Sequence, residues 1–330
     1  MTSSPELIVP TIDDIRAAAE RIASHAVRTP LLESPHLNEI VGGRLLVKAE
    51  PLQRTGAFKF RGAYNTLVQI PENERKNGVV AFSSGNHAQG VAHAAELLGL
   101  PAVIVMPKDA PPLKVENTRG YGAEVVLYDR YTENREEIGA RIADERGATL
   151  VKPYDDPRII AGQGTAGLEI TEQLDGNLDQ VLCPVGGGGL ASGVAIAIKA
   201  AYPDASVYAC EPAGYDSMGR SLAAGAITGN DAGAGATICD ALLPKSPGNF
   251  TFAIGQDLFA GGLAVTDDQV RSAMAQAFLR LKLVVEPGGA AGLAAALSGV
   301  LDCSGKTTVA VCSGGNVDPS LFADVLRDCL

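Results

Sequence analysis

Two kinds of hydrophobic pattern alternate along the chain. Short apolar runs rich in β-branched residues are typical of buried strands, and longer Ala-rich segments with apolar positions three and four residues apart are typical of amphipathic helices. This alternation predicts an α/β protein with parallel sheets. The predicted strands are 79–82, 102–106, 124–127, 180–185, 206–210 and 307–312, and the predicted helices are 12–25, 87–98, 133–146, 159–174, 267–281 and 318–330.

The chain of 330 residues is long enough for about two domains. The polar stretch 71–78 and the turn-rich stretch 153–157 are its strongest breaks. We expect them to bracket a small domain, residues 78–155, inserted in a large domain formed by residues 1–77 and 156–330.

Composition and charge exclude several classes of protein. The net charge is −11 and no run of Lys and Arg forms a basic stripe, so nucleic acid is not an expected partner. The longest uncharged stretch, 181–198, is broken by Pro184 and four glycines, so we expect no membrane span and read it as strand, loop and helix. The N-terminus has no basic start and no long apolar run, which predicts a cytoplasmic protein.

The six cysteines all lie in the second half of the chain, without C-x-x-C spacing. We expect neither a disulfide framework nor a zinc site. Cys183, Cys210 and Cys312 lie in predicted strands, where a thiol behaves as a small hydrophobic side chain.

Three predicted strands run directly into loops of Gly, Ser and Asn that open a helix. Such loops lie at the carboxyl ends of strands, where open α/β sheets bind ligands and the N–H groups of a helix N-terminus attract anions. Four consecutive glycines also let the backbone approach a phosphate closely. The loops are Ser83-Ser84-Gly85-Asn86-His87, Gly186-Gly187-Gly188-Gly189 and Ser313-Gly314-Gly315-Asn316.

The glycine run has a second interpretation. Gly186, Gly188 and Ala191 fit the G-x-G-x-x-A pattern of dinucleotide-binding proteins, and Glu211 ends the next strand, where a ribose-binding acid could stand. A nucleotide-binding oxidoreductase is therefore an alternative hypothesis.

A lysine between two phenylalanines begins another predicted helix. Lys59 is flanked by Phe58 and Phe60, and partial burial there would lower the pKa of its amine, which favours Schiff-base chemistry. The alternative is a lysine that extends from an apolar surface into solvent.

Taken together, these motifs resemble the fold-type II pyridoxal 5'-phosphate (PLP) enzymes of the threonine/serine dehydratase and serine racemase family, which includes 3-hydroxyaspartate dehydratases. The match covers nearly the whole chain, in the family's order. Besides the lysine motif and the three loops it includes 160–165, Glu211-Pro212 and 282–287.

The resemblance implies two open, twisted, mostly parallel sheets flanked by helices, as in the tryptophan synthase β-like fold, and a PLP cofactor. It implies that Lys59 forms the Schiff base, that Asn86 meets the ring hydroxyl and that Ser313 meets the pyridine nitrogen. The implied cofactor-binding residues are Phe58, Lys59, Asn86, Gly186, Gly187, Gly188, Gly189, Leu190, Glu286 and Ser313.

The implied reaction is β-elimination from a β-hydroxy α-amino acid, either L-serine, L-threonine or 3-hydroxyaspartate, to a 2-oxo acid and ammonia. Lys59 takes the Cα proton, and Ser84 is the acid/base on the opposite face in racemases and 3-hydroxyaspartate dehydratases. Ser84 could instead only bind its own loop or the substrate carboxylate. The implied substrate-binding residues are Ser83, Ser84, Gly85, Asn86, His87 and Arg135.

Arg135 matches an arginine that reaches a bound dicarboxylate in serine racemase relatives, and Lys152 is a second candidate cation. The alternative for Arg135 is an ordinary surface ion pair with Glu133.

Relatives that bind Mg²⁺ or Ca²⁺ use a Glu, a carbonyl four residues later and an Asp six residues later. These positions are Glu211, Tyr215 and Ser217 here, with Asp216 one residue out of register. A cation site at these four residues is therefore an open expectation.

The resemblance also implies a homodimer. A serine- or aspartate-type racemase that uses Lys59 and Ser84 remains the alternative within the family, and a non-catalytic small-molecule binding protein is the alternative outside it.

Overall fold

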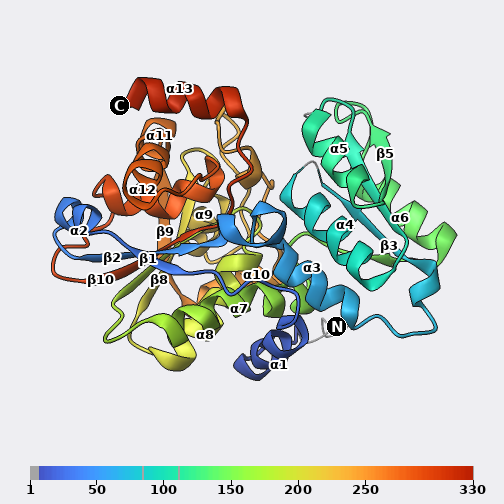
Figure 1. Ribbon diagram of the computed structural model, residues 1–330, viewed down its shortest axis with the longest axis horizontal. Coiled ribbons are helices and arrows are strands. Elements are labelled where there is room, and N and C mark those ends of the chain that lie inside the picture. The colour runs from blue at the N-terminus through green and yellow to red at the C-terminus, as the bar shows by residue number, and fades with distance from the viewer. Residues whose placement is uncertain (1–6, 84, 111, 330) are drawn as a thin grey trace.

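The structure is a computed structural model, and it describes residues 7–83, 85–110 and 112–329. The described strands form two sheets, which lie on opposite sides of the molecule in Figure 1. The larger sheet has the order β1-β2-β10-β7-β8-β9 and the smaller one has the order β5-β4-β3-β6. All neighbouring strands are parallel except β1 and β2. The predicted α/β class with two mostly parallel sheets is confirmed.

The strands are β1 (Leu31–Glu33), β2 (Arg44–Ala49), β3 (Val79–Phe82), β4 (Ala102–Pro107), β5 (Glu124–Tyr128), β6 (Thr149–Leu150), β7 (Gln180–Pro184), β8 (Ser206–Pro212), β9 (Phe259–Val265) and β10 (Thr307–Cys312). The α-helices are α1 (Ile12–Ile22), α2 (Pro35–Val41), α3 (Lys59–Val68), α4 (Asn86–Leu98), α5 (Pro112–Gly120), α6 (Arg135–Arg146), α7 (Pro157–Gln173), α8 (Gly189–Ala201), α9 (Ser217–Ala224), α10 (Asn249–Leu258), α11 (Asp267–Gln276), α12 (Ala291–Leu297) and α13 (Pro319–Cys329).

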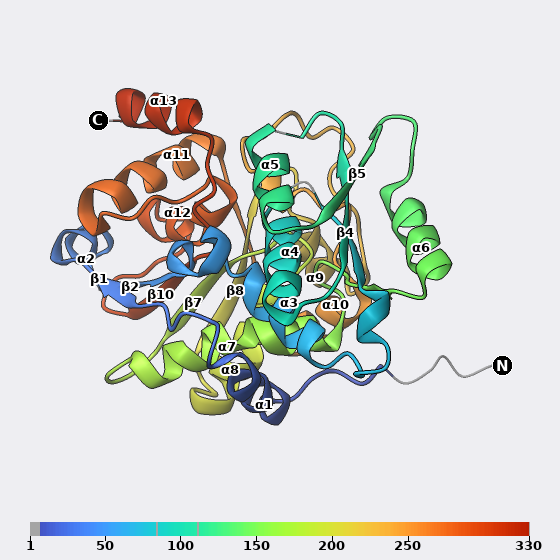
Figure 2. The same ribbon diagram turned by 45° about the vertical axis from the view of Figure 1, so that its right-hand side comes forward.

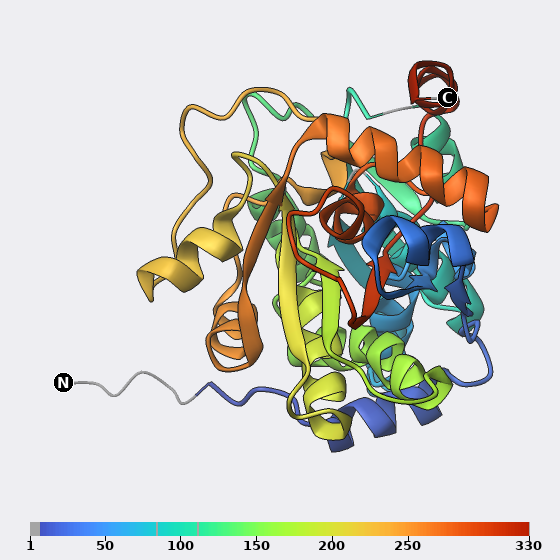
Figure 3. The same cartoon turned by 90° about the vertical axis from the view of Figure 1, so that its left-hand side faces the viewer.

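Both faces of the larger sheet are buried. Along β10, Ala310 and Cys312 pack into the cluster that contains α11 and α12, while Val309 and Val311 pack into the cluster that contains α7 and α8. Figure 3 shows these two helix layers on either side of the sheet. A strand buried on both faces reads as a continuous apolar run, which is why 307–312 was predicted with the correct bounds.

The smaller sheet is also covered on both faces. Val79 and Ala81 of β3 pack with α3 and α4, and Val80 and Phe82 pack with α6. In Figure 2, β4 stands between α4 and α6. All of its strands lie inside the span 78–155, where the sequence predicts a small domain; the boundaries themselves stay a prediction.

Several elements differ from their predicted bounds or were not predicted. The helix predicted over 12–25 ends at Ile22, and the helix predicted over 267–281 changes after Gln276 into one π-helical stretch, η5 (Ala277–Leu281). Strand β2 was missed because Arg44 and Lys48 interrupt its apolar run, and β9 was missed because two glycines lie at its centre. Among the described residues, no helix has both the length and the apolar character needed to cross a membrane.

Candidate active site

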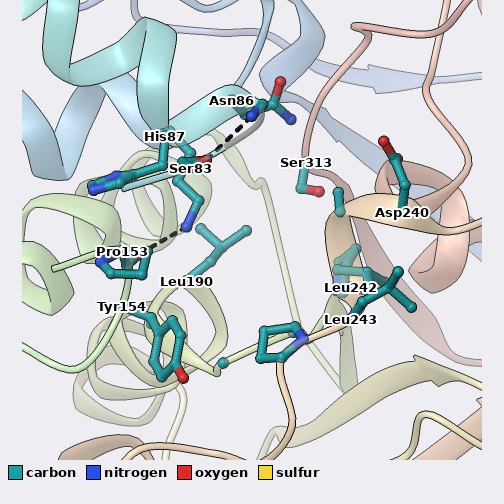
Figure 4. A pocket seen from close by; sticks show the side chains of 18 of the residues that line it. Ser83, Asn86, His87, Pro153, Tyr154, Leu190, Asp240, Leu242, Leu243 and Ser313 are labelled. Carbon is teal, nitrogen blue, oxygen red and sulfur yellow. Dashed lines mark hydrogen bonds between the residues drawn. The ribbon is translucent and has the colours of Figure 1, made fainter. Parts of the chain in front are cut away.

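The predicted site residues meet in one pocket. The pocket lies where β3, β7 and β10 end, so the three Gly-, Ser- and Asn-rich loops face it from both sheets (Figure 4). Ser84 lies outside the described residues. The predicted residues that line the pocket are Phe58, Lys59, Ser83, Gly85, Asn86, His87, Arg135, Gly186, Gly187, Gly188, Gly189, Leu190, Glu286 and Ser313.

Lys59 is the first residue of α3, and its amine is held inside the pocket. Its Nζ donates a hydrogen bond to the carbonyl of Pro153 at 2.7 Å and lies 5.1 Å from the centre of the Phe58 ring. Burial lowers the pKa of this amine to about 8, although the negative charge of Glu286 acts in the opposite direction. A larger share of neutral, nucleophilic amine is therefore present near neutral pH than for a solvated lysine. The alternative of a lysine extended into solvent is wrong.

The segment just before Lys59, residues 56–58, is hydrogen-bonded to the loop that follows β10. The N–H of Phe58 donates to the carbonyl of Ser313 at 3.1 Å, and the N–H of Gly315 donates to the carbonyl of Gly56 at 2.9 Å. Gly56 has φ +72°, and a Cβ there would lie 2.6 Å from Oδ1 of Asn316. These contacts place the Ser313 side chain beside the start of α3.

Asn86 is fixed at both ends of its side-chain amide. Its Nδ2 donates to Oε1 of Glu286, and its Oδ1 accepts a hydrogen bond of 2.8 Å from Asn316. Asn316 also donates to the carbonyl of Thr55 at 2.7 Å, so it joins three segments of the site. Burial, and then the nearby charge of Asp240, raise the pKa of Glu286 to about 7. Asn316 had no predicted role beyond its place in the third loop.

The glycine loop after β7 presents backbone donors at the start of α8. Within the described residues, the N–H groups of Gly186, Gly187 and Gly188 donate to no protein acceptor. Donors of this kind at a helix N-terminus form an anion site. Gly188 has φ +97°, and a Cβ on it would lie 2.8 Å from Cβ of Thr251.

The absence of a side chain at Gly187 has a second cause besides the predicted one. A Cβ there would lie 2.2 Å from Cγ of Tyr154, so the ring of Tyr154, and not only a phosphate, requires glycine. Tyr154 follows the carbonyl that binds Lys59 and lines the pocket. Asp155 then accepts hydrogen bonds from the N–H groups of Asn249 (3.2 Å) and Phe250 (2.9 Å) at the start of α10. From the sequence, this segment was predicted only as a domain break.

The loop after β3 presents the N-terminus of α4 to the pocket. Ser83 Oγ accepts a hydrogen bond of 3.2 Å from the N–H of Gly85, and the helix begins at Asn86. His87 is buried, and Nε2 donates to the carbonyl of Val151 at 3.1 Å. Burial, and then the charge of Lys59, lower the pKa of His87 to about 3, so its ring is neutral. The described residues of this loop can therefore bind a carboxylate through N–H groups and a hydroxyl, without a charged imidazole.

Arg135 lines the pocket and lies over the ring of Phe82, 5.7 Å from the ring centre. Among the described residues it forms no ion pair with Glu133 or another carboxylate. Lys152, the second predicted cation, is exposed and does not line the pocket. The lining instead includes Lys114 and Asp240, neither of which the sequence analysis selected as a charged group of the site.

The predicted cation site has a poor set of ligands. Both oxygens of Glu211 already accept hydrogen bonds of 2.9 Å, Oε1 from the N–H of Met218 and Oε2 from that of Gly219, at the start of α9. Ser217 brings no charge, Tyr215 would contribute only its neutral backbone carbonyl, and Asp216 directly precedes α9, one residue out of register. In the part of the chain that is described, no three His, Cys, Asp or Glu side chains are grouped to hold a metal ion.

The same contacts argue against the dinucleotide hypothesis, because the carboxylate of Glu211 is occupied by α9 and does not line the pocket. The groups that do line it fit PLP. They are a buried amine for the aldehyde, unpartnered backbone donors for the phosphate, and the hydroxyl of Ser313 for the ring nitrogen.

Comparisons with known proteins agree with this set of donors. Residues 22–314 match the model of the family described as pyridoxal-phosphate dependent enzyme. The chain is 46% identical over 314 residues to an L-threo-3-hydroxyaspartate ammonia-lyase of Pseudomonas sp, covering 95% of this chain and 98% of that protein. It is 42% identical to a serine racemase of Schizosaccharomyces pombe, covering 98% and 99% of the two chains.

A solved structure of maize serine racemase superposes with a TM-score of 0.91 at 40% identity, covering 97% of this chain and 98% of that chain. The family model and these relatives, which match nearly the whole chain, cover the segments that carry Lys59, the glycine loop and both sheets. The chain belongs to the family of pyridoxal-phosphate dependent enzymes.

Proposed function

We propose that this chain is a PLP-dependent ammonia-lyase that converts a β-hydroxy α-amino acid into a 2-oxo acid and ammonia. The observation that carries the proposal is Lys59 at the start of α3, whose amine faces a pocket where α4 and α8 also begin. The similarity to an L-threo-3-hydroxyaspartate ammonia-lyase over 95% of the chain supports 3-hydroxyaspartate as the first candidate substrate, before L-serine and L-threonine.

PLP, when bound, supplies an electron sink that makes the Cα–H bond of the substrate acidic. The N–H groups at the start of α4 bind the α-carboxylate, and this orients Cα toward Lys59. The neutral Lys59 amine takes the Cα proton, the Cβ–O bond breaks, and the hydroxyl takes up a proton and leaves as water. Addition of water to the resulting enamine then releases ammonium and the 2-oxo acid.

Arg135 supports a substrate with a second carboxylate. It lines the same pocket and has no described carboxylate partner, so its guanidinium is available to a ligand anion. A pocket for serine or threonine alone would not need this cation.

The test is a substrate panel. Release of ammonia and 2-oxo acid is measured with L-serine, D-serine, L-threonine and the 3-hydroxyaspartate stereoisomers, using wild type, Lys59→Ala and Arg135→Gln. Lys59→Ala should be inactive, and the exposed Lys152→Ala serves as the matched control with wild-type rates. Selective release from one 3-hydroxyaspartate isomer, weakened at least tenfold in Arg135→Gln, is the expected result. If ammonia is released from serine or threonine alone, the dicarboxylic substrate is removed from the proposal. If ammonia is released from none of the substrates, the proposed lyase activity is overturned.

Racemisation is the second candidate function, and the 42% identity to a serine racemase favours it. It requires the proton to return to Cα from the other face before the hydroxyl leaves. Chiral analysis of serine and aspartate after incubation with the enzyme measures it directly. If the enzyme forms more of the opposite enantiomer than of the 2-oxo acid, racemisation becomes the first candidate function.

We propose that the reaction needs no added Mg²⁺ or Ca²⁺, because both oxygens of Glu211 are already bonded to α9 and the position six residues later is the neutral Ser217, with Asp216 one residue out of register. Dialysis against EDTA should leave both the rate and the unfolding temperature unchanged. A several-fold gain in rate on adding MgCl₂ or CaCl₂ would overturn this part of the proposal.

We make three further proposals. Residues 78–155, which hold every described strand of the smaller sheet, form the small domain. The chain is a homodimer, as the family resemblance implies, and the protein acts in the cytoplasm, as its N-terminal sequence predicts. Light scattering of the purified protein measures the mass of the assembly, and a monomer mass would contradict the homodimer.

A further inference from the structure

An ion pair joins the two halves of the molecule at the pocket. Nζ of Lys114 in α5 lies 3.2 Å from Oδ2 of Asp240 in the 3-10 turn η4 (Asp240–Leu242). The side chain of Lys114 is 18% exposed and that of Asp240 is 61% exposed. In Figure 4, Asp240 stands across the cavity from Pro153 and Tyr154. Both members of the pair line the pocket.

Lys114 lies next to the loop that receives the substrate. A Cβ built on Gly85 would be 3.9 Å from Nζ of Lys114 and would meet no other atom within 4 Å. Lys114 also acts on Glu286, because its charge lowers the pKa of that carboxyl while Asp240 raises it. The ammonium of Lys114 is therefore inside the electrostatic environment of the site and is not an outer surface charge.

We propose that Lys114 determines specificity for a dicarboxylic substrate by exchanging Asp240 for the substrate's β-carboxylate. This inference rests on the proposed function. With a monocarboxylic amino acid the pair stays intact, and with a dicarboxylic one the ammonium keeps an anionic partner while Asp240 is released.

The difference in exposure makes the exchange favourable. Asp240 is 61% exposed, so little free energy is lost when its ion pair with Lys114 is broken, whereas the ammonium of Lys114 is only 18% exposed and is better compensated when an anion stays beside it. Asp240 thus competes with the substrate carboxylate for Lys114 and repels it. Removing either member of the pair should therefore change the affinity for a dicarboxylate in opposite directions.

The probes are L-aspartate and L-alanine, which differ by one carboxylate and carry no β-hydroxyl to eliminate. Their dissociation constants are measured on the holoenzyme from the absorbance of bound PLP immediately after mixing. Lys114→Gln should weaken the binding of L-aspartate about tenfold, which is the effect of losing one charge-assisted hydrogen bond. The affinity for L-alanine should stay within about twofold of wild type. Asp240→Asn should strengthen the binding of L-aspartate, and it should leave the affinity for L-alanine within about twofold of wild type.

Two variants complete the experiment. Lys114→Arg keeps the charge and should retain the preference for L-aspartate, and Lys108→Gln removes an exposed lysine of the same half and should behave as wild type. Unfolding temperature and PLP content show that each variant is folded and loaded.

The outcomes separate the inference from the proposed function. Weaker binding of L-aspartate in both Lys114→Gln and Asp240→Asn would identify a purely structural ion pair and overturn the inference. Equal losses of affinity for L-aspartate and L-alanine in Lys114→Gln would place Lys114 at the α-carboxylate. That result would also overturn the inference. If wild type does not prefer L-aspartate, both the dicarboxylate substrate and the role of Lys114 fail, while ammonia release from serine or threonine would still support the lyase.

Discussion

At the scale of single residues, the site depends on side chains whose ionisation is set by burial. Lys59 is half-buried and Glu286 is buried, and burial lowers the pKa of the amine to about 8 and raises that of the carboxyl to about 7. Asn86 and Ser313 are neutral, so the charge of the site comes from a small number of groups. The chemistry of this pocket therefore responds to pH near neutrality.

The first prediction concerns the pH at which Lys59 becomes reactive. Attachment of PLP to the apoenzyme requires the neutral amine, so its rate should rise with pH and be half-maximal near pH 8, not near the 10.5 of an ordinary lysine. The charge of Glu286 raises the pKa of Lys59, so Glu286→Gln should move the midpoint to lower pH. Stopped-flow absorbance measures the rate, and the exposed Glu145→Gln is the control. A midpoint near 10, or a shift upward in Glu286→Gln, contradicts the prediction.

At the scale of elements, the site is built where helices begin and strands end. The carboxyl ends of β3, β7 and β10 supply the three loops, and α3, α4 and α8 begin at the pocket. The segment before α7 also lines the pocket, through Pro153 and Tyr154. Asp155 binds the N-terminus of α10, and Asp156 accepts a hydrogen bond of 2.8 Å from the N–H of Arg158 at the start of α7.

The second prediction is that Asp155 holds the pocket wall through α10. Asp155→Ala removes the acceptor of two N–H groups and should cost about 0.5–2 kcal/mol of stability. It should also weaken PLP binding, because Thr251 in α10 donates to the carbonyl of Gly187 at 2.7 Å. Denaturant unfolding and PLP titration measure the two effects.

The matched control is Thr266→Ala, which removes the capping residue of α11 outside the pocket lining. It should lose comparable stability and keep wild-type PLP affinity. Equal loss of PLP affinity in both variants would show that Asp155 acts only through global stability.

At the scale of the whole molecule, a buried charge network connects α3 to the larger sheet and to α7. Arg61 is fully buried and pairs with Glu50 after β2 at 2.8 Å and with Glu169 in α7 at 2.6 Å. Lys48 of β2 pairs with the same Glu169 at 2.6 Å. The helix that begins with Lys59 is thus attached to β2 and α7 by charged groups, of which Arg61, Glu50 and Lys48 are fully buried and Glu169 is partly exposed.

The third prediction is that Arg61→Leu costs about 3–5 kcal/mol of unfolding free energy, because it leaves the buried Glu50 without its counter-ion. Arg61→Lys should recover only part of this, since lysine cannot make the two parallel bonds that the guanidinium makes to Glu50. Urea unfolding measures the change. The exposed pair of Arg16 and Asp13 supplies the control, and Arg16→Ala should change stability by less than about 1 kcal/mol. A similar small change in Arg61→Leu would contradict the prediction.

The sequence by itself determined the α/β class, most of the buried strands, the three loops and Lys59. Each of these is a local signal, since apolar periodicity, glycine runs and a lysine between phenylalanines can be recognised within one element. The cysteines in β7, β8 and β10 are buried as predicted for the same reason.

Only the tertiary structure decided which distant groups meet. Asn316 binds Asn86 across 230 residues, Lys114 pairs with Asp240 across 126, and Tyr154 occupies the space above Gly187. Glu211 turned out to bind the start of α9, and Arg135 to face the pocket. Hydrogen bonds and ion pairs act over a few ångströms between elements, and no periodicity within one element specifies the partner in another. The charged groups that line the pocket therefore followed from the packing of the two sheets, while Lys59 and its apolar neighbours could be recognised from the chain alone.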